Sequence, residues 1–243
     1  MPVSANTLFH FTRERENLIG IIEHGFYPSY SLEDLSAILP PDRLTAVHVP
    51  MVCFCDILLS QIGKHIEYYG EYGIGLRKKE WGIPRGISPI VYVDDNSRTA
   101  ALMRRVVEDV VKASLPKDAP LKEQLLDFCK YMKAYEGLVR NRTTGKMENR
   151  RFYDEREWRY SPPNAHAWPS ERPTEVVLRK ANKDLRAHGL KFEAADVKYI
   201  IVSKESEIPA IIRSINRSRD IPTKAKALLS SKVISVEQIK EDM

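Results

Sequence analysis

Cysteine is scarce in this chain, and its scarcity excludes one class of protein. The 243 residues hold only three cysteines. Small secreted domains that depend on disulfides carry a denser and even-numbered set. The sequence therefore predicts a protein without a disulfide framework, in a reducing cytoplasm.

Glycine and proline are also few. The chain has 11 glycines and 15 prolines, which is too few for a collagen-like or low-complexity protein. Hydrophobic residues make up 43% and charged residues 29%, close to the ordinary usage of globular proteins. A chain of this length buries a core of its own, so we expect a folded protein without repeats.

Long apolar runs are missing as well. The most apolar stretch, residues 44–63, contains Pro50 and Asp56 and reads as a strand, a turn and a helix. The N-terminal residues lack the charged and then apolar segments of a signal peptide. We therefore expect no contact with a membrane.

The excess of one sign of charge is small. The chain has 38 Lys and Arg against 33 Asp and Glu, a net charge of +5 with a pI near 9.0. Histones and basic tails are far more basic. This excess permits contact with a nucleotide or a nucleic acid, and a plain cationic surface explains it equally well.

Several familiar sites are absent as sequence patterns. We find no GxxxxGK[ST], GxGxxG or GxSxG pattern, and no nuclease arrangement. Cys53 and Cys55 have no matching second pair and the six histidines are scattered, so we expect no metal. Gly70, Gly73 and Gly75 predict tight turns around the start of a strand.

Hydrophobic periodicity predicts an α+β fold in a single domain over residues 1–243. It predicts strands over residues 7–12, 47–54, 73–76, 88–93, 175–178 and 197–203, with a last short strand near Val233. It predicts a long β-hairpin over residues 138–160, with its turn at residues 143–146. Helices are expected over residues 16–25, 31–39, 57–69 and 205–216, and at the tail.

A helical pair is expected in the middle of the chain. Residues 97–112 and 121–135 each carry an apolar stripe at helical spacing. We expect this pair, residues 97–136, to be an insertion outside the β core. There it would cover a cleft or contact a partner.

The first local pattern with chemical meaning is Phe9-His10-Phe11-Thr12. On a strand, His10 and Thr12 share one face and Phe9 and Phe11 the other. An imidazole and a hydroxyl two residues apart could together hold a diol such as a ribose. A half-buried histidine followed by a helix-capping threonine fits the same residues.

The second local pattern covers residues 153–160. Alternation places Trp158 and Tyr160 on the core face, and Glu155, Glu157 and Arg159 on the other face. Charges crowded on one face repel unless they meet water or a ligand. A carboxylate there could stabilise an oxocarbenium-like transition state, as glycosyl transfer requires. A solvated strand face with a local Glu–Arg pair fits equally well.

In this order, the two patterns resemble the ADP-ribosyltransferase superfamily. His10 and Thr12 match the H-x-[TY] form of its first motif. Residues 52–56 occupy the second motif, with Cys53 and Cys55 where many members have Ser or Thr. Glu157 matches the third motif. The resemblance implies a split β core with flanking helices, and an NAD-dependent mono-ADP-ribosyltransferase.

The resemblance also implies roles in binding NAD, which would be a substrate. His10 and Thr12 would hydrogen-bond the adenosine-side ribose. One of Tyr68, Tyr69 and Tyr72 would stack on the nicotinamide. The run that begins with His10 and Thr12 in the first motif looks like the opening of superfamily members that modify DNA or RNA. The resemblance therefore leaves a protein and a nucleic acid open as the acceptor of ADP-ribose.

The charged residues of the third motif receive the catalytic roles. The resemblance implies that Glu157 holds the nicotinamide ribose while the glycosidic bond loosens. Glu155, in the E-x-E spacing of arginine-modifying members, would orient the nucleophile. Arg159 would hold the pyrophosphate through a bidentate contact.

A second resemblance covers more of the chain. Residues 8–12, 49–56, 68–78 and 155–159 are similar to the AbiGi family of bacterial abortive phage-resistance proteins. That family is described as the antitoxin side of a two-gene system, which implies a partner toxin. Two functions therefore stay open: an NAD-using transferase in antiviral defence, and an inactive transferase-like antitoxin that neutralises a partner toxin.

Overall fold

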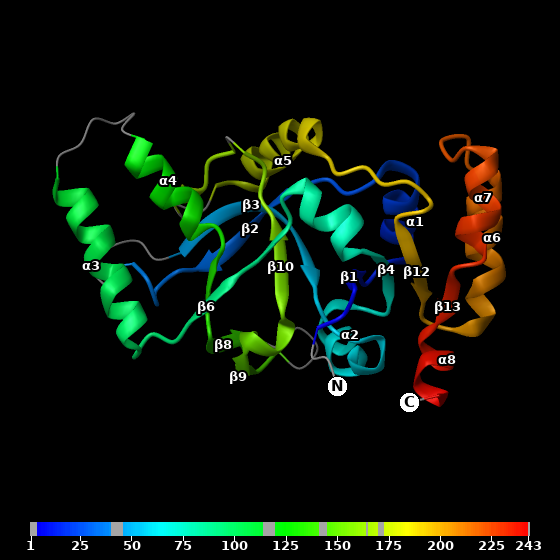
Figure 1. Cartoon of the computed structure of the whole chain (residues 1–243), viewed down its shortest axis with the longest axis horizontal. Helices are drawn as coiled ribbons and strands as arrows, with labels where there is room; N and C mark the ends of the chain where they lie inside the picture. The colour runs from blue at the N-terminus through cyan, green and yellow to red at the C-terminus, as the bar shows by residue number, and fades with distance from the viewer. Residues whose placement is uncertain are drawn as a thin grey trace. The chain divides into compact units, whose positions relative to one another are not determined.

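The structure is a computed structural model that describes residues 4–39, 46–113, 120–140, 145–163, 165–169 and 173–242 (Figure 1). The chain forms two compact units, each built from separate stretches of sequence. Unit 1 comprises Met1–Tyr27, Cys53–Ser88 and Gly189–Met243, and unit 2 comprises Pro28–Val52 and Pro89–His188. Both strands and helices occur in each unit, which confirms the α+β class. The single domain over residues 1–243 stays a prediction.

Unit 1 is a mixed sheet with flanking helices. Its strands follow the order β13-β12-β4-β1-β3, in which only the β12–β13 pair is parallel. Its elements are β1 (Thr7–Thr12), α1 (Arg15–His24), the end of β3 (Ala46–Cys55), α2 (Gly63–Tyr69), β4 (Tyr72–Arg77), β12 (Val197–Val202), α6 (Ile208–Arg217), α7 (Thr223–Ser230), β13 (Val233–Ser235) and α8 (Val236–Glu241).

The alternation predicted for β1 is confirmed. Phe9 and Phe11 pack in a cluster with residues of α2 and α8 on one face of the sheet. His10 turns the other way, where its ring lies against Phe26 and Phe54. The strand is therefore buried on both faces, as expected for the middle of a sheet that helices cover.

Two of the three glycines around β4 have a role that the sequence analysis got wrong. Gly73 and Gly75 lie inside β4, and not in turns. The rings of Phe11 and Phe9 on β1 cover them, so an added Cβ would lie 2.7 Å and 2.8 Å from ring carbons. Gly70 does end α2 with a φ of +107°, which other residues rarely adopt.

Unit 2 is built around the first part of β3. In the sheet order β10 follows β3 and β5 follows β10, while β2 and β11 also pair with β3. Two further pairs, β6–β7 and β8–β9, stand apart from this sheet. Its elements are β2 (Ser29–Asp34), β5 (Ser88–Pro89, at the boundary of the units), β6 (Val91–Val93), α3 (Arg98–Lys112), α4 (Pro120–Cys129), β7 (Met132–Ala134), β8 (Glu136–Arg140), β9 (Met147–Arg151), β10 (Glu157–Tyr160), β11 (Trp168–Pro169) and α5 (Glu175–Asp184).

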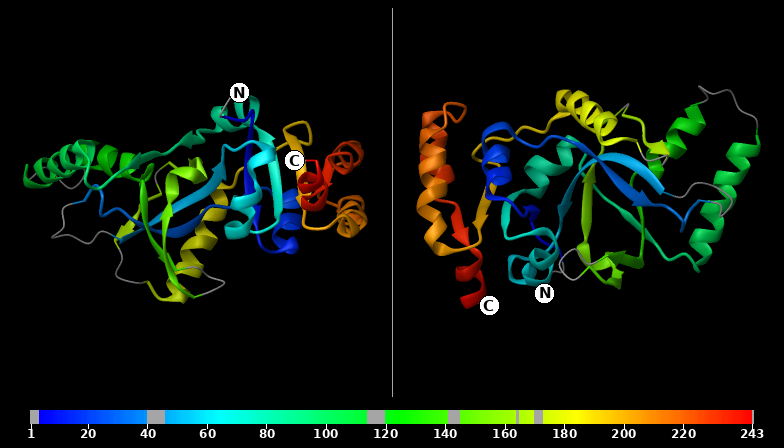
Figure 2. Two further views of the ribbon diagram at one scale, coloured as in Figure 1. Left: turned by 90° about the horizontal axis from the view of Figure 1, so that it is seen from below. Right: turned by 180° about the vertical axis from the view of Figure 1, so that it is seen from behind.

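The helical pair predicted in the middle of the chain is present as α3 and α4 (Figure 2). Ser97 caps α3 by accepting a hydrogen bond from the backbone N–H of Ala100. The second helix ends at Cys129, earlier than predicted, because Met132–Ala134 forms β7 and pairs in parallel with β6.

The helix predicted over residues 31–39 is wrong. Ser29–Asp34 is the strand β2, which pairs with β3 along its whole length, from Ser29 opposite Met51 to Asp34 opposite Ala46. Strand pairing supplies backbone hydrogen bonds that outweigh a weak local helix preference.

The strand predicted over residues 175–178 is also wrong. These residues open the helix α5, and Thr174 caps it by accepting a hydrogen bond from the backbone N–H of Val177. Val176 and Val177, which suggested a strand, are exposed on this helix. The capping threonine with an acidic residue after it was the better signal.

The long hairpin predicted over residues 138–160 is present only in its first part. Strands β8 and β9 pair from Glu136 opposite Arg151 to Arg140 opposite Met147, and residues 143 and 144 of the predicted turn lie outside the described residues. A short 3₁₀ turn, Phe152–Glu155, then ends the pairing of β8 with β9. Arg156 follows with a φ of +45°, and β10 joins a different sheet.

The C-terminal region contains one helix that the sequence analysis missed. The predicted strands at residues 197–203 and near Val233 are confirmed as β12 and β13, and the helix between them as α6. The missed helix is α7, which lies beside α6 (Figures 1 and 2). Within the residues that the structure describes, every helix falls short of the length and apolar character that a bilayer span requires.

Candidate functional site

Arg159 and Glu157 of β10 lie at the centre of a buried group of charges in unit 2. The Arg159 side chain is 0% exposed and that of Glu157 is 6% exposed. The Nε and Nη2 atoms of Arg159 lie 2.9 Å and 2.8 Å from Oε1 of Glu157, so two nitrogens of the guanidinium share one carboxylate oxygen. Nη2 also lies 3.2 Å from Oε2 of Glu33 on β2. Nη1 donates to the backbone carbonyl of Lys130.

Lys133 of β7 joins the two carboxylates of the E-x-E pattern. Its Nζ atom lies 2.8 Å from Oε2 of Glu155 and 3.0 Å from Oε2 of Glu157. On the far side of Glu155, Oε1 lies 3.1 Å from Nη2 of Arg150 on β9. We call these residues the ion cluster: Glu33, Lys133, Arg150, Glu155, Glu157 and Arg159.

The ion cluster is balanced in charge. It contains three carboxylates, two guanidinium groups and one ammonium group. Burial of a charge costs several kcal/mol unless an opposite charge and hydrogen bonds compensate it. The backbone N–H of Glu157 donates to the hydroxyl of Tyr92, and burial raises the pKa of that hydroxyl. Tyr92 therefore acts there as a neutral hydrogen-bond acceptor.

The facing predicted for residues 155–160 is wrong. Glu157 and Arg159 do share one face of β10, but that face is the buried one. Trp158 and Tyr160 are only partly buried. The hydrophobic pattern misled because the partners that make burial of charge tolerable, Glu33 and Lys133 among them, come from distant strands. The sequence has no signal that would place them together.

His10 and Thr12 lie on β1 in unit 1. The Nδ1 atom of His10 lies 2.8 Å from the backbone carbonyl of Cys53. Burial lowers the pKa of His10, and the contact with that carbonyl partly opposes this effect. Thr12 accepts a hydrogen bond from the side-chain amide of Asn17, while the N-cap position of α1 is Glu14. His10 thus sits in a packed environment, and Thr12 is not a helix cap.

The three tyrosines proposed for nicotinamide also lie in unit 1. Tyr69 stacks on His65 with ring centroids 4.4 Å apart. The Tyr72 hydroxyl donates to Glu207 over 2.8 Å, and burial together with that carboxylate raises its pKa to about 12. Tyr68 is 37% exposed. The structure thus places His10, Thr12 and the tyrosines in one unit and Glu155, Glu157 and Arg159 in the other, so a cleft that they share stays a prediction.

A second buried group of charges lies where the second motif ends, and the sequence analysis missed it. Asp56 accepts hydrogen bonds from the backbone N–H of Ala5, the hydroxyl of Ser4 and Nζ of Lys78, at 2.8 Å, 2.6 Å and 2.9 Å. Asp56 and Lys78 are each 7% exposed. These contacts anchor the segment before β1, and they are structural.

The contacts within the ion cluster occupy the side chains for which catalytic roles were predicted. All three nitrogens of the Arg159 guanidinium have partners within unit 2, so a pyrophosphate would have to displace Glu157 or Glu33. Both oxygens of Glu157 contact cations. Among the described residues, no group of three or more His, Cys, Asp and Glu is placed to hold a metal ion. NAD binding stays a prediction.

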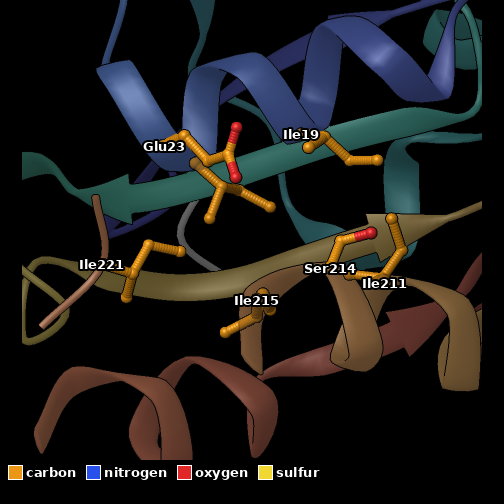
Figure 3. A pocket seen from close by; sticks show the side chains of 7 residues that line it. Ile19, Glu23, Ile211, Ser214, Ile215 and Ile221 are labelled. Carbon is orange, nitrogen blue, oxygen red and sulfur yellow. The ribbon is translucent and has the colours of Figure 1, made fainter. Parts of the chain in front are cut away.

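Unit 1 has two grooves between helices. The first runs between α1 and α6, with Ile19 and Glu23 on one side and Ile211 and Ile215 on the other (Figure 3). It is too narrow for a water molecule, so it is a packing seam. The second lies between α2 and α8 and has a volume of about 190 Å³. That is below the range of about 300–1,000 Å³ that is usual for sites of small organic ligands.

Comparison with known proteins gives a consistent result. A family model described as "Putative abortive phage resistance protein AbiGi, antitoxin" matches residues 24–203. An abortive phage resistance protein AbiGi of Lactococcus lactis subsp. cremoris is 27% identical over 248 aligned positions, which cover 89% of this chain and 99% of that protein. No solved structure matches the chain. The chain belongs to the AbiGi family of abortive phage resistance proteins.

Proposed function

We propose that this protein is the antitoxin of an abortive-infection pair and acts by binding a partner toxin. The observation that carries the proposal is the family match over residues 24–203, whose description names an antitoxin. An antitoxin of this kind needs a stable scaffold and a surface for its partner. It needs no reacting group.

The ion cluster supports the scaffold part of this proposal. Each of its carboxylates has a cation within 3.2 Å inside unit 2. A catalytic carboxylate is typically aimed at the position where charge develops in a substrate. The carboxylates of the ion cluster are instead neutralised by their neighbours, as in a network that fixes the relative positions of β2, β7, β9 and β10.

The outer face of α3 and α4 supports the surface part. The inner sides of both helices pack in the core of unit 2, where Ala100 and Cys129 are buried. Large apolar side chains also cover their outer sides, which is unusual for helices that face only water. We call the exposed members the outer apolar patch: Leu102, Val106, Leu121, Leu126 and Phe128.

Two arginines indicate which partner segment fits the outer apolar patch. Arg98 and Arg105 are exposed on α3, on the same side as Leu102. Neither has an ion pair or side-chain hydrogen bond among the described residues. We propose that a toxin segment with apolar anchors and an acidic rim binds here, because such a segment would bury the patch and pair both arginines.

Growth experiments test the antitoxin proposal. The gene is expressed alone, the neighbouring gene of the same operon is expressed alone, and both are expressed together. We expect the neighbouring product to stop growth, this chain alone to leave growth unchanged, and co-expression to restore it. A stable complex of the two purified proteins on size-exclusion chromatography is the matching biochemical result.

The transferase alternative predicts the opposite pattern. Growth arrest by this chain alone, with transfer of label from NAD to an acceptor in a host lysate, would overturn the antitoxin proposal. In that case Glu157→Gln should remove both the labelling and the arrest. Circular dichroism must show that the Glu157→Gln variant is folded, because Glu157 is buried in the ion cluster.

A further inference from the structure

One short segment of unit 1 carries a net positive charge equal to that of the whole chain. Residues 208–232, which form α6, α7 and their connection, hold six of the 38 Lys and Arg and one of the 33 Asp and Glu. The segment thus has a net charge of +5. The rest of the chain holds 32 residues of each sign and is neutral. The segment lies beyond residue 203, where the family match ends.

Four of these cations are exposed and have no partner among the described residues. Among the residues that the structure describes, no ion pair or side-chain hydrogen bond involves Arg213, Arg217, Arg219 or Lys224. Ile211 and Ile215 hold the opposite side of α6 in the core. Arg213 and Arg217 are four residues apart and therefore stand on the same outward face. We call the four residues the cationic patch.

The cationic patch lies around the end at which α6 and α7 join. Lys226 of α7 donates a hydrogen bond over 2.8 Å to the backbone carbonyl of Asn216, near the end of α6. This contact brings the start of α7, with Lys224, close to the end of α6, with Arg217. Asp220 is the one acidic residue of the segment, and its carboxylate lies 3.7 Å from Nδ1 of His24 on α1.

We propose that the cationic patch is a binding site for the phosphate backbone of a nucleic acid duplex. Unpaired guanidinium and ammonium groups on adjoining helices are the groups that contact phosphates and release counterions. Residues 208–232 contain no Phe, Tyr or Trp. Binding of single strands relies on aromatic side chains that stack on the bases, so the segment favours a duplex.

Fluorescence anisotropy with the full-length protein and a labelled 30-base-pair DNA of arbitrary sequence tests this proposal. Four phosphate contacts predict a slope of log K against log[salt] of about −3 to −4. The affinity should therefore fall about 100-fold between roughly 50 mM and 200 mM salt. The single strand of the same sequence should bind more weakly. An RNA duplex in place of the DNA shows which duplex supplies the phosphates.

A charge-neutral variant and a matched control decide the location of the site. Replacement of all four residues of the cationic patch by Gln should abolish duplex binding. The control replaces four other exposed cations that have no partner among the described residues, namely Lys64, Lys79, Lys180 and Lys183, by Gln. It removes the same net charge and should bind as the original protein does.

Three results would overturn the proposal. They are unchanged binding in the patch variant, an equal loss in the control, and displacement of the duplex by polyglutamate as readily as by unlabelled duplex. Circular dichroism shows whether both variants are folded. Gln has nearly the helix propensity of Lys and Arg, so we expect the helices to persist.

Discussion

Arg159 shows how much a single residue depends on its partners. Its side chain is fully buried, and its charge is compensated by Glu157 and Glu33. Removal of one member of a buried ion pair leaves the other charge uncompensated and typically costs about 3–5 kcal/mol. We expect Arg159→Ala to lower the free energy of unfolding in urea by about this amount.

A double variant separates charge from packing. Glu157→Leu combined with Arg159→Met should lose less stability than the sum of the two single changes, because each single change also breaks the Glu157–Arg159 pair and the double variant counts that loss once. Arg179→Ala is the control, since Arg179 and its partner Glu175 are 82% and 86% exposed. It should unfold at the same urea concentration as the original protein. Additive losses in the double variant would contradict this account of the ion cluster.

His10 predicts a pH dependence of stability. Burial lowers the pKa of its imidazole in the folded protein, whereas in the unfolded chain the pKa is near 6.5. As the pH falls below about 6.5, the unfolded chain therefore binds a proton that folded His10 resists, and stability is lost. The stability that His10→Gln removes should be larger at pH 7 than at pH 5.

Urea unfolding of both proteins at the two pH values measures this difference. The other five histidines are common to the two proteins, so their titration cancels in the comparison. An equal cost of His10→Gln at both pH values would show that the histidine contributes through packing alone.

At the scale of elements, local patterns predicted the long and strongly periodic segments. The alternation of β1, the apolar run of β3 and the stripes of α3 were sufficient, because each is dictated by neighbours in sequence. The errors occurred where distant pairing decides. Ser29–Asp34 became a strand through β3, and β10 left the predicted hairpin to join another sheet.

In the candidate site too, features set by neighbours in sequence were predicted and features set by distant residues were not. The sequence indicated that Glu157 and Arg159 share a face of one strand, which the structure confirms. It gave no means to find Lys133, Arg150 and Glu33, since they lie on three separate short strands that are distant from one another in sequence or unmarked by any motif. These partners decide which side of β10 is buried. The predicted facing of β10 was therefore reversed.

The helices α3 and α4 carry the prediction for partner binding. Leu126 and Phe128 are 61% and 47% exposed, so their replacement by Ser should change stability by no more than about 0.5 kcal/mol. If they anchor the toxin, the same change should weaken the complex by about 2 kcal/mol or more, roughly 30-fold. Isothermal titration calorimetry with the purified partner measures this loss.

Val176→Ser provides the control for this experiment. Val176 is 76% exposed on α5 of the same unit and lies outside the outer apolar patch. It should leave the affinity unchanged. An equal effect of the two replacements would show that the toxin does not recognise α3 and α4.

At the scale of the whole molecule, the connection of the units predicts cooperative unfolding. The chain passes between unit 1 and unit 2 four times, and β3 contributes residues to both. If β3 unfolds together with one unit, the other unit therefore loses the part of β3 that belongs to it. We expect far-ultraviolet circular dichroism and tryptophan fluorescence to report one coincident thermal transition.

Arg159→Ala sharpens this expectation. Arg159 lies in unit 2, as do Trp158 and Trp168, while Trp81 lies fully buried in unit 1. With Trp158 and Trp168 replaced by Phe in both the original protein and the variant, tryptophan fluorescence reports on unit 1 alone. In a cooperative molecule, the variant should shift both signals to the same lower temperature. A fluorescence transition that stays in place while the circular dichroism signal moves would indicate that the units unfold separately.

The glycines of β4 have a consequence for how relatives of this protein vary. Phe9 and Phe11 occupy the space that side chains at positions 75 and 73 would need. A relative that carries alanine or a larger residue at either position must therefore carry a smaller residue opposite it on β1. These four positions should co-vary as two size-matched pairs, and a relative with phenylalanine and a large residue facing each other would need a different register between the two strands.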